Sequence, residues 1–161
     1  MKSWKHWQLF AALVVAFFTA IPAHAQVDKA AMRTTGISCG ECAAISEVYL
    51  RQLVGVDKVT ISKSQEVVVI TYKPGSSFQP WDIRDALEKT DVGVVQFQVS
   101  ARGRLQETGG KKYFIAGKDK FVLAQASVSV PADATVEVQG IVNDKPDPME
   151  LKVLTVKPLP K

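Results

Sequence analysis

Two residues in this sequence have the type and spacing for a specific chemistry. Cys39 and Cys42 are the only cysteines, and Gly40 and Glu41 separate them. A disulfide bond stabilises a fold more when it closes a longer loop, so a bridge between these two would contribute little. The spacing therefore favours a chemical role for the thiols, either soft-metal binding or thiol–disulfide exchange.

The predicted position of the pair favours its ionised form. A helical pattern begins at Glu41, so Cys42 is expected in or beside the first helical turn and Cys39 in the loop before it. The unpaired N–H groups of a helix N-terminus carry partial positive charge, which lowers the pKa of a nearby thiol below its free value of about 8.5. The thiolate is both the metal ligand and the nucleophile.

The residue types around the pair restrict the metal. Structural zinc requires four ligands, usually Cys and His. Both histidines, His6 and His24, lie in the predicted signal peptide, so the mature chain would offer two sulfurs and no imidazole. Two soft ligands suit a soft ion of low coordination number, with Cu(I) first and Hg(II) or Ag(I) as further options.

The elements that would position the cysteines follow from hydrophobic periodicity. A short strand is predicted at residues 30–35. The helix from Glu41 to Gly55 is expected to bury a face made of Ile45, Val48, Tyr49 and Leu53. Strands are predicted around Val59–Ile61, Val68–Tyr72 and Val95–Val99, and a second helix starts at Pro80. This order predicts an α+β fold, a ferredoxin-like βαββαβ sandwich.

The remaining residues form a different pattern. From about residue 104 short apolar runs alternate with turn signals and show no helical period. These runs are Tyr113–Ile115, Phe121–Leu123, Val128–Val130, Val136–Ile141 and Leu151–Val156. Five short strands predict a small all-β domain, a barrel or sandwich, with an OB-like barrel as one form. The predicted organisation is a signal peptide at 1–25, a ferredoxin-like domain at 26–103 and a β-rich domain at 104–161.

The segment Gly36-Ile37-Ser38-Cys39-Gly40-Glu41-Cys42 resembles the motif Gly-Met-Thr-Cys-x-x-Cys of the heavy-metal-associated domain family. That family includes copper chaperones, modules of copper-transporting ATPases and periplasmic mercuric-ion binding proteins. The resemblance continues through Val59-x-Ile61, Val68-x-Ile70-x-Tyr72-x-Pro74 and Ile83-x-x-Ala86-Leu87-Glu88, and it covers residues 29–100. It implies Cys39 and Cys42 as metal ligands, the same set of soft ions, and transfer of the ion to a partner by ligand exchange.

The chain departs from the family pattern at five places. Ile37 replaces the usual Met, whose side chain in the family packs under the loop, and Ser38 replaces Thr. Glu41 places a negative charge between the cysteines, which opposes thiolate formation slightly. The loop at 89–93 is longer than the corresponding loop of the family, and in the family that loop tunes metal preference. The β-rich part of the chain has no counterpart in the family pattern.

The first residues predict export. Lys2 and Lys5 precede an uncharged apolar stretch from Leu9 to Ile21, followed by Ala23-His24-Ala25, which is the order of a cleaved secretory signal. We therefore expect a periplasmic protein that begins at Gln26. Removing the signal lowers the formal charge from +4 to +2, and no basic run remains, so nucleic acid is not an expected partner.

The sequence thus predicts a metal-binding protein rather than an enzyme. Its expected partners are a metal ion and a metal-transporting membrane protein or another metal-accepting protein, and nothing in the sequence assigns an oligomeric state. Two alternatives stay open. One is a thiol–disulfide redox protein that uses the same pair. The other is an interaction module in which the β-rich part does the work.

Overall fold

The computed structural model describes residues 24–159, so the predicted signal peptide lies almost wholly outside the described part of the chain. Within that part, no helix is long and apolar enough to cross a membrane. The elements in chain order are β1 (Gln26–Thr35), α1 (Gly40–Arg51), β2 (Val56–Ser62), β3 (Val67–Tyr72), α2 (Pro80–Glu88), β4 (Gly93–Thr108), β5 (Lys111–Ala116), β6 (Asp119–Leu123), β7 (Val136–Asn143) and β8 (Glu150–Pro158).

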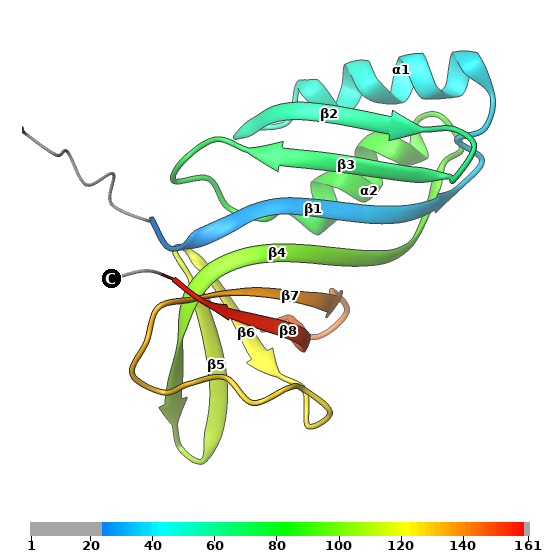
Figure 1. Ribbon diagram of the computed structural model, residues 1–161. Coiled ribbons are helices and arrows are strands. Elements are labelled where there is room, and N and C mark those ends of the chain that lie inside the picture. Colours follow the sequence, from blue (N-terminus) through cyan, green and yellow to red (C-terminus); the bar gives the residue numbers. More distant parts are fainter. Residues whose placement is uncertain (1–23, 160–161) are drawn as a thin grey trace, which may run out of the picture.

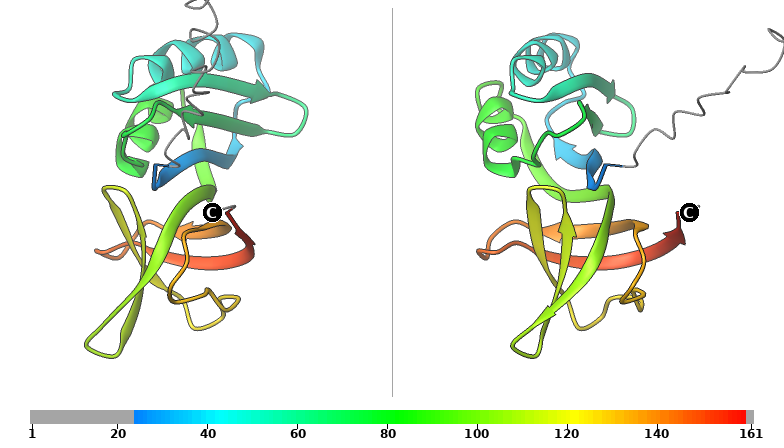
Figure 2. Two further views of the ribbon diagram at one scale, coloured as in Figure 1. Left: turned by 60° about the vertical axis from the view of Figure 1, so that its left-hand side comes forward. Right: turned by 90° about the vertical axis from the view of Figure 1, so that its left-hand side faces the viewer.

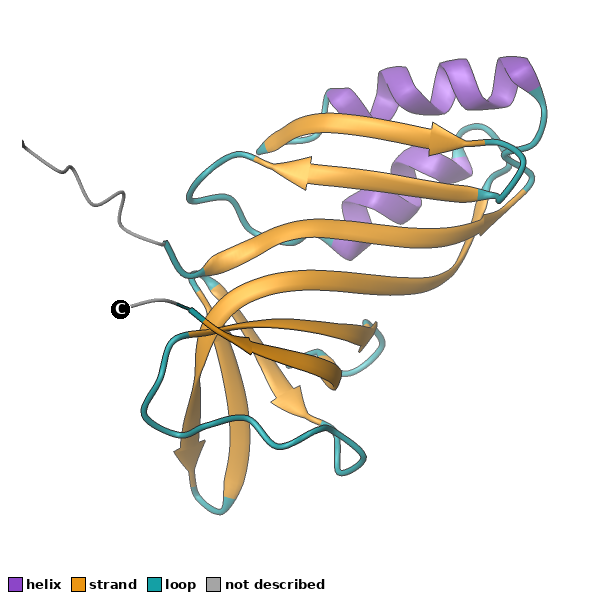
Figure 3. Cartoon of the chain, viewed as in Figure 1, coloured by secondary structure: helices purple, strands orange, loops and turns teal. Residues whose placement is uncertain are grey.

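The first six elements form the predicted ferredoxin-like sandwich (Figure 1). The strands are antiparallel in the order β2-β3-β1-β4, and both helices cover one face of this sheet. Inward-facing residues alternate along β3, where Val68, Ile70 and Tyr72 are buried. Figure 3 shows the helices together on that face. The loop between β1 and α1 lies at one end of the sandwich, where the chain passes from the sheet to the helices.

The buried face of α1 differs in part from the predicted one, since Tyr49 and Leu53 pack against the core as expected. Ala43, Ser46 and Leu50 are buried, whereas Ile45 and Val48 are about half exposed. The hydroxyl of Ser46 explains the difference, because it forms a hydrogen bond with Thr90 Oγ1 at 2.6 Å and is thereby satisfied inside the fold. A count of apolar residues cannot detect a polar residue that is buried with its partner.

Strand β4 belongs to both parts of the molecule. Its residues from Gly93 to Arg102 pair with β1, and those from Arg104 to Thr108 pair with β5. The change of partner occurs at Gly103, where a Cβ atom would lie 2.2 Å from the carbonyl oxygen of Ile115. Only glycine allows the two backbones to approach so closely. The predicted boundary between residues 103 and 104 falls at this position, inside a continuous strand.

The strands after β4 return to it and close a ring. β4 pairs with β5, β5 with β6, β6 with β8, β8 with β7, and β7 with the middle of β4. All of these pairings are antiparallel except β6–β8. The ring lies below the first sheet in the two views of Figure 2. Since β7 pairs with Phe97 to Gly103, it covers the edge that β4 would otherwise expose.

One of the predicted strands is absent. Residues 128–130 form no strand, although the N–H of Val128 donates to the carbonyl oxygen of Val153 at 2.9 Å. Ser127 holds this segment by its side chain, which donates to the carbonyl oxygen of Leu151 and accepts from the N–H of Val153. A serine bound to the neighbouring strand thus replaces the ladder that the apolar run predicted.

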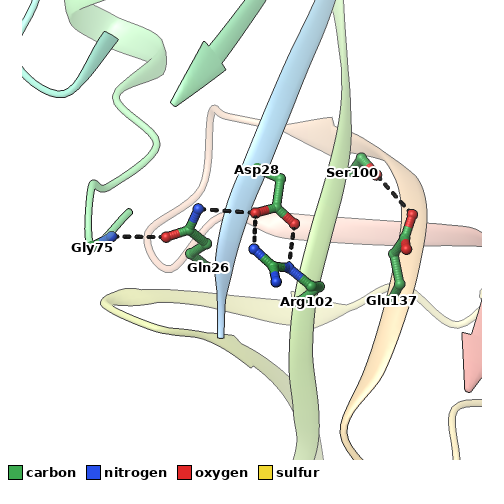
Figure 4. Close-up of polar contacts among 6 residues, drawn as sticks. All are labelled: Gln26, Asp28, Gly75, Ser100, Arg102 and Glu137. Atoms are coloured by element: carbon green, nitrogen blue, oxygen red, sulfur yellow. Dashed lines mark hydrogen bonds and ion pairs between the residues drawn. The ribbon is translucent and has the colours of Figure 1, made fainter. Parts of the chain in front are cut away.

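A continuous core and a set of polar contacts join the two parts. Phe78, on the segment before α2, packs edge-on against Phe97 of β4 at 5.5 Å between ring centroids and lies 6.5 Å from Phe121 of β6. At the other side of the junction, Arg102 binds both carboxylate oxygens of Asp28, and Gln26 links Asp28 to the N–H of Gly75 (Figure 4). The Asp28 pairing raises the pKa of Arg102.

Candidate metal centre

The two cysteines lie where β1 meets α1. Cys39 is exposed and caps the helix, and Cys42 is half-buried in the first helical turn. The backbone of Cys39 is extended, with φ −76° and ψ 142°, so its side chain turns back towards the helix and its Sγ accepts a hydrogen bond from the N–H of Cys42 at 3.0 Å. Its carbonyl oxygen accepts the first helical bond, from Ala43.

The structure joins Cys39 and Cys42 by a disulfide bond, with their Cα atoms 5.3 Å apart. The fold therefore brings the two predicted site residues together. The sulfurs in this state are oxidised and carry no charge. Binding of a metal ion by both of them requires reduction first, which takes two electrons and breaks the S–S bond.

Two neighbouring segments and the buried side chain of its own Ile37 hold the loop of residues 36–39. Ile37 is fully buried and fixes the loop from below, as the resemblance to the family implies for that position. Gly36 has φ +88°, and a Cβ atom there would lie 3.0 Å from the carbonyl oxygen of Asp91. The N–H of Gly36 also donates to Oε1 of Glu66 at 3.3 Å. The loop before β4 and the β2–β3 turn therefore both abut the cysteine loop.

The donor set is small. Within residues 24–159, no group of three or more His, Cys, Asp or Glu side chains is arranged to hold a metal ion. Glu41 lies between the cysteines and is exposed. Two sulfurs on an accessible loop can hold an ion of low coordination number, and they leave it open to a third sulfur from another molecule.

A second group of buried polar side chains lies at the junction of the two parts and does not include the cysteines. Oδ2 of Asp119, at the start of β6, accepts a hydrogen bond from the N–H of Phe78 at 2.9 Å. Burial raises the pKa of Asp119 to about 6. Burial, and then the charge of Asp119, raise the pKa of Tyr72, whose hydroxyl has no hydrogen-bond partner among the described residues. This group ties β6 to the segment before α2.

The main hollow of the barrel also lies apart from the cysteines. A cavity of about 560 Å³ opens between β5 and the segment 124–130, and its lining includes Leu105, Lys112 and Val128. None of its lining residues comes from the strands and helices before β4. Nothing in the sequence pattern predicted this cavity, because residues 128–130, which line it, were expected to form a strand.

The βαββαβ order and the paired cysteines at the β1–α1 loop are the features that carry the predicted resemblance to heavy-metal-associated domains. Sequence similarity agrees with it. The chain is 32% identical over 110 residues to human copper-transporting ATPase 2 and 41% identical over 83 residues to the rat protein. These matches cover 63% and 52% of this chain, but the chain spans only 7% and 5% of those proteins' lengths.

Two solved structures are similar to part of this chain. The chain is similar to a CopZ metallochaperone, with 25% identity and a TM-score of 0.38, over 42% of this chain and 98% of that one. It is also similar to the yeast copper transporter domain Ccc2a, with 23% identity and a TM-score of 0.37. No protein-family model matches the chain. The sequence relatives thus support the predicted resemblance to heavy-metal-associated domains.

Proposed function

We propose that this protein binds one soft metal ion, Cu(I) in the first place, between Cys39 and Cys42 and passes it to a metal-accepting partner in the periplasm. The observation that carries the proposal is the position of the two sulfurs, side by side on an accessible loop at the N-terminus of α1. The names of the sequence relatives, copper-transporting ATPases, support copper as the cargo. The signal-like first residues support export.

The chemistry is carriage rather than catalysis. A dithiol reductant supplies two electrons and two protons to the disulfide, which gives two thiols here and a disulfide in the reductant. Binding of the ion then releases the two protons and forms two S–metal bonds. Because only two ligands come from this chain, a thiol of the partner can enter, and one of the two cysteines can then leave. The β1–α1 loop presents the sulfurs outward, which suits such an exchange. An oligomer is not required for it.

We also propose that β4 to β8 form an OB-like barrel. The strand order β4-β5-β6-β8-β7-β4, with a single parallel pairing between β6 and β8, supports this assignment. The barrel's structural contribution is to cover the edge of the ferredoxin-like sheet through β7.

The test is an anaerobic Cu(I) titration of the reduced mature protein against a coloured chelator. We expect one tightly held ion per chain, lost in Cys39→Ser and in Cys42→Ser. Ser38→Ala is the matched control, since Ser38 is an exposed neighbour in the same loop. Binding by the wild type no tighter than by the cysteine variants would contradict the proposal.

The disulfide favours a second candidate, thiol–disulfide exchange by the same pair. A redox protein would reduce a small-molecule disulfide without any metal, and its rate would fall in the cysteine variants. A metal carrier would bind Cu(I) reversibly and reduce that substrate no faster than a free dithiol. The two measurements on one preparation separate the candidates.

A further inference from the structure

The turn between β2 and β3 is fixed against the cysteine loop. Its last residue, Glu66, has a positive φ of 51°, and its carbonyl oxygen accepts hydrogen bonds from both the N–H and the hydroxyl of Thr34. Its side chain accepts from the N–H of Gly36. Thr34 and Gly36 lie at the end of β1, immediately before the cysteines. The β2–β3 turn is therefore held beside the site by three hydrogen bonds.

This turn brings a cation to the cysteines. Lys63 is its first residue, and its Nζ lies 3.9 Å from the position that a Cβ atom would occupy on Gly40, between Cys39 and Cys42. Within residues 24–159 the ion pairs join Arg51 to Glu47, Arg84 to Asp144 and Arg102 to Asp28, so Lys63 has no carboxylate partner there. Its positive charge is available to the sulfur pair.

The charge of the loaded site depends on the valence of the ion. The reduced pair without metal is the same starting state for every ion, so its own charge cancels when ions are compared. A monovalent ion held by two thiolates leaves one net negative charge, whereas a divalent ion held by the same two thiolates leaves none. A fixed positive charge nearby therefore stabilises the first complex and leaves the second unchanged to first order.

We propose that Lys63 is a specificity-determining residue, which favours monovalent Cu(I) or Ag(I) over divalent Hg(II) between Cys39 and Cys42. The inference rests on the proposed metal-binding function and deepens it. The acids Glu41, Glu66 and Asp91 belong to the segments around this loop, and Glu66 is engaged with Gly36. These acids are present in every Lys63 variant, so their effect on the metal affinity cancels when the variants are compared.

The experiment compares metals as well as variants. Dissociation constants for Cu(I), Ag(I) and Hg(II) are measured on the reduced protein by competition with chelators, for the wild type, Lys63→Gln, Lys63→Arg and Lys63→Glu. Lys58→Gln is the matched control, an exposed lysine on β2, the strand that leads into this turn, five residues before Lys63 and roughly 16 Å away. Thermal unfolding of each apo variant checks that the fold is unchanged.

We expect Lys63→Gln to weaken Cu(I) and Ag(I) by about two- to fivefold, the size of a single exposed charge interaction, with Hg(II) unchanged. Lys63→Arg should retain wild-type affinities, and Lys63→Glu should weaken the monovalent ions further. The effect should shrink in about 1 M salt, where the screening length is only about 3 Å. Lys58→Gln should change nothing.

Two results would overturn the inference. Equal weakening of monovalent and divalent ions by Lys63→Gln would assign the lysine a merely structural role, and no change for any ion would show that its charge does not act on the site. Failure of the proposed function looks different: the wild type itself would then bind none of the three ions more tightly than Cys39→Ser and Cys42→Ser do.

Discussion

Arg84 of α2 donates two hydrogen bonds to the carboxylate of Asp144, from Nε to Oδ2 at 2.6 Å and from Nη2 to Oδ1 at 3.0 Å. Asp144 directly follows β7. The same guanidinium donates to the carbonyl oxygen of Val94 and lies 5.0 Å over the ring of Phe97. One side chain thereby joins a helix of the ferredoxin-like part to the barrel and to the shared strand β4. α2 leads into the loop at 89–92, so this contact also steadies a neighbour of the cysteines.

Removing one partner of this pair should destabilise the fold. We expect Asp144→Asn to lower the free energy of unfolding by about 1–3 kcal/mol, because it weakens a bidentate and largely buried contact. Arg84→Gln should have a similar effect, and the double variant should cost less than the sum. Urea unfolding measures all three. Arg51→Gln is the control, since its exposed pair with Glu47 should be worth less than about 0.5 kcal/mol.

Asp119 should make the protein less stable as the pH rises from about 4 to about 6. Its pKa of about 6 in the fold lies above its ordinary value near 4, so the folded state binds more protons than the unfolded state in this window. Two pKa units correspond to about 3 kcal/mol. Asp119→Asn should remove this loss and raise stability at pH 7, since an amide oxygen can still accept from Phe78.

The measurement for Asp119 is urea unfolding at pH 4, 5, 6 and 7, with Asp133→Asn, an exposed acid, as the control. Asp144 acts in a different window: its pKa is lowered by the hydrogen bonds from Arg84, so its contribution is present above pH 4 and is lost below it. A wild-type profile that rises between pH 4 and 6, or a profile unchanged in Asp119→Asn, would contradict the prediction.

Gly36→Ala should disturb the cysteine loop itself. A side chain at this position meets both a positive φ and the carbonyl oxygen of Asp91 at 3.0 Å, so we expect a cost of about 1–2 kcal/mol and weaker Cu(I) binding. Gly75→Ala is the matched control, because Gly75 has a similar φ of +78° with open space around it. If the two variants lose the same stability and Gly36→Ala binds Cu(I) normally, the Asp91 contact does not shape the site.

Metal should protect the thiols from oxidation. Sulfurs committed to an ion are poor nucleophiles for disulfide exchange, so the Cu(I)-loaded protein should resist a mild disulfide oxidant that closes Cys39–Cys42 in the apo protein. Protein isolated from the periplasm without metal should be largely disulfide-bonded, as in this structure. Alkylation of free thiols followed by mass measurement distinguishes the two forms. Fully reduced apo protein from that compartment would contradict the prediction.

The sequence predicted the ferredoxin-like part well because its signals are local. Alternation at Val68, Ile70 and Tyr72 marked β3, Pro80 marked the start of α2, and the cysteines were placed correctly at the start of α1. The predicted face of α1 was only partly right, because the burial of Ser46 depends on Thr90, 44 residues away. Such a contact leaves no periodic trace.

The parts that could not be predicted depend on which strands meet. The apolar run at 128–130 looked like a strand, but its neighbour β8 is engaged through Ser127 instead. The sequence did not point to Lys63 as a neighbour of the cysteines. The β2–β3 turn is held there by hydrogen bonds that Thr34 and Gly36 donate to Glu66, and these contacts cannot be read from the sequence. A lysine in a turn is ordinarily just solvated, and its sequence neighbours give no other indication.

The continuity of β4 limits how this molecule can be taken apart or recombined. A chain ended at residue 103 would lose β7. The stretch from Phe97 to Gly103 would then be an exposed strand edge, which can pair with other copies of the chain and cause aggregation. A graft that exchanged the metal-binding half for another would have to carry the whole of β4 with it. The two parts therefore have to be kept together in any engineered variant of this protein.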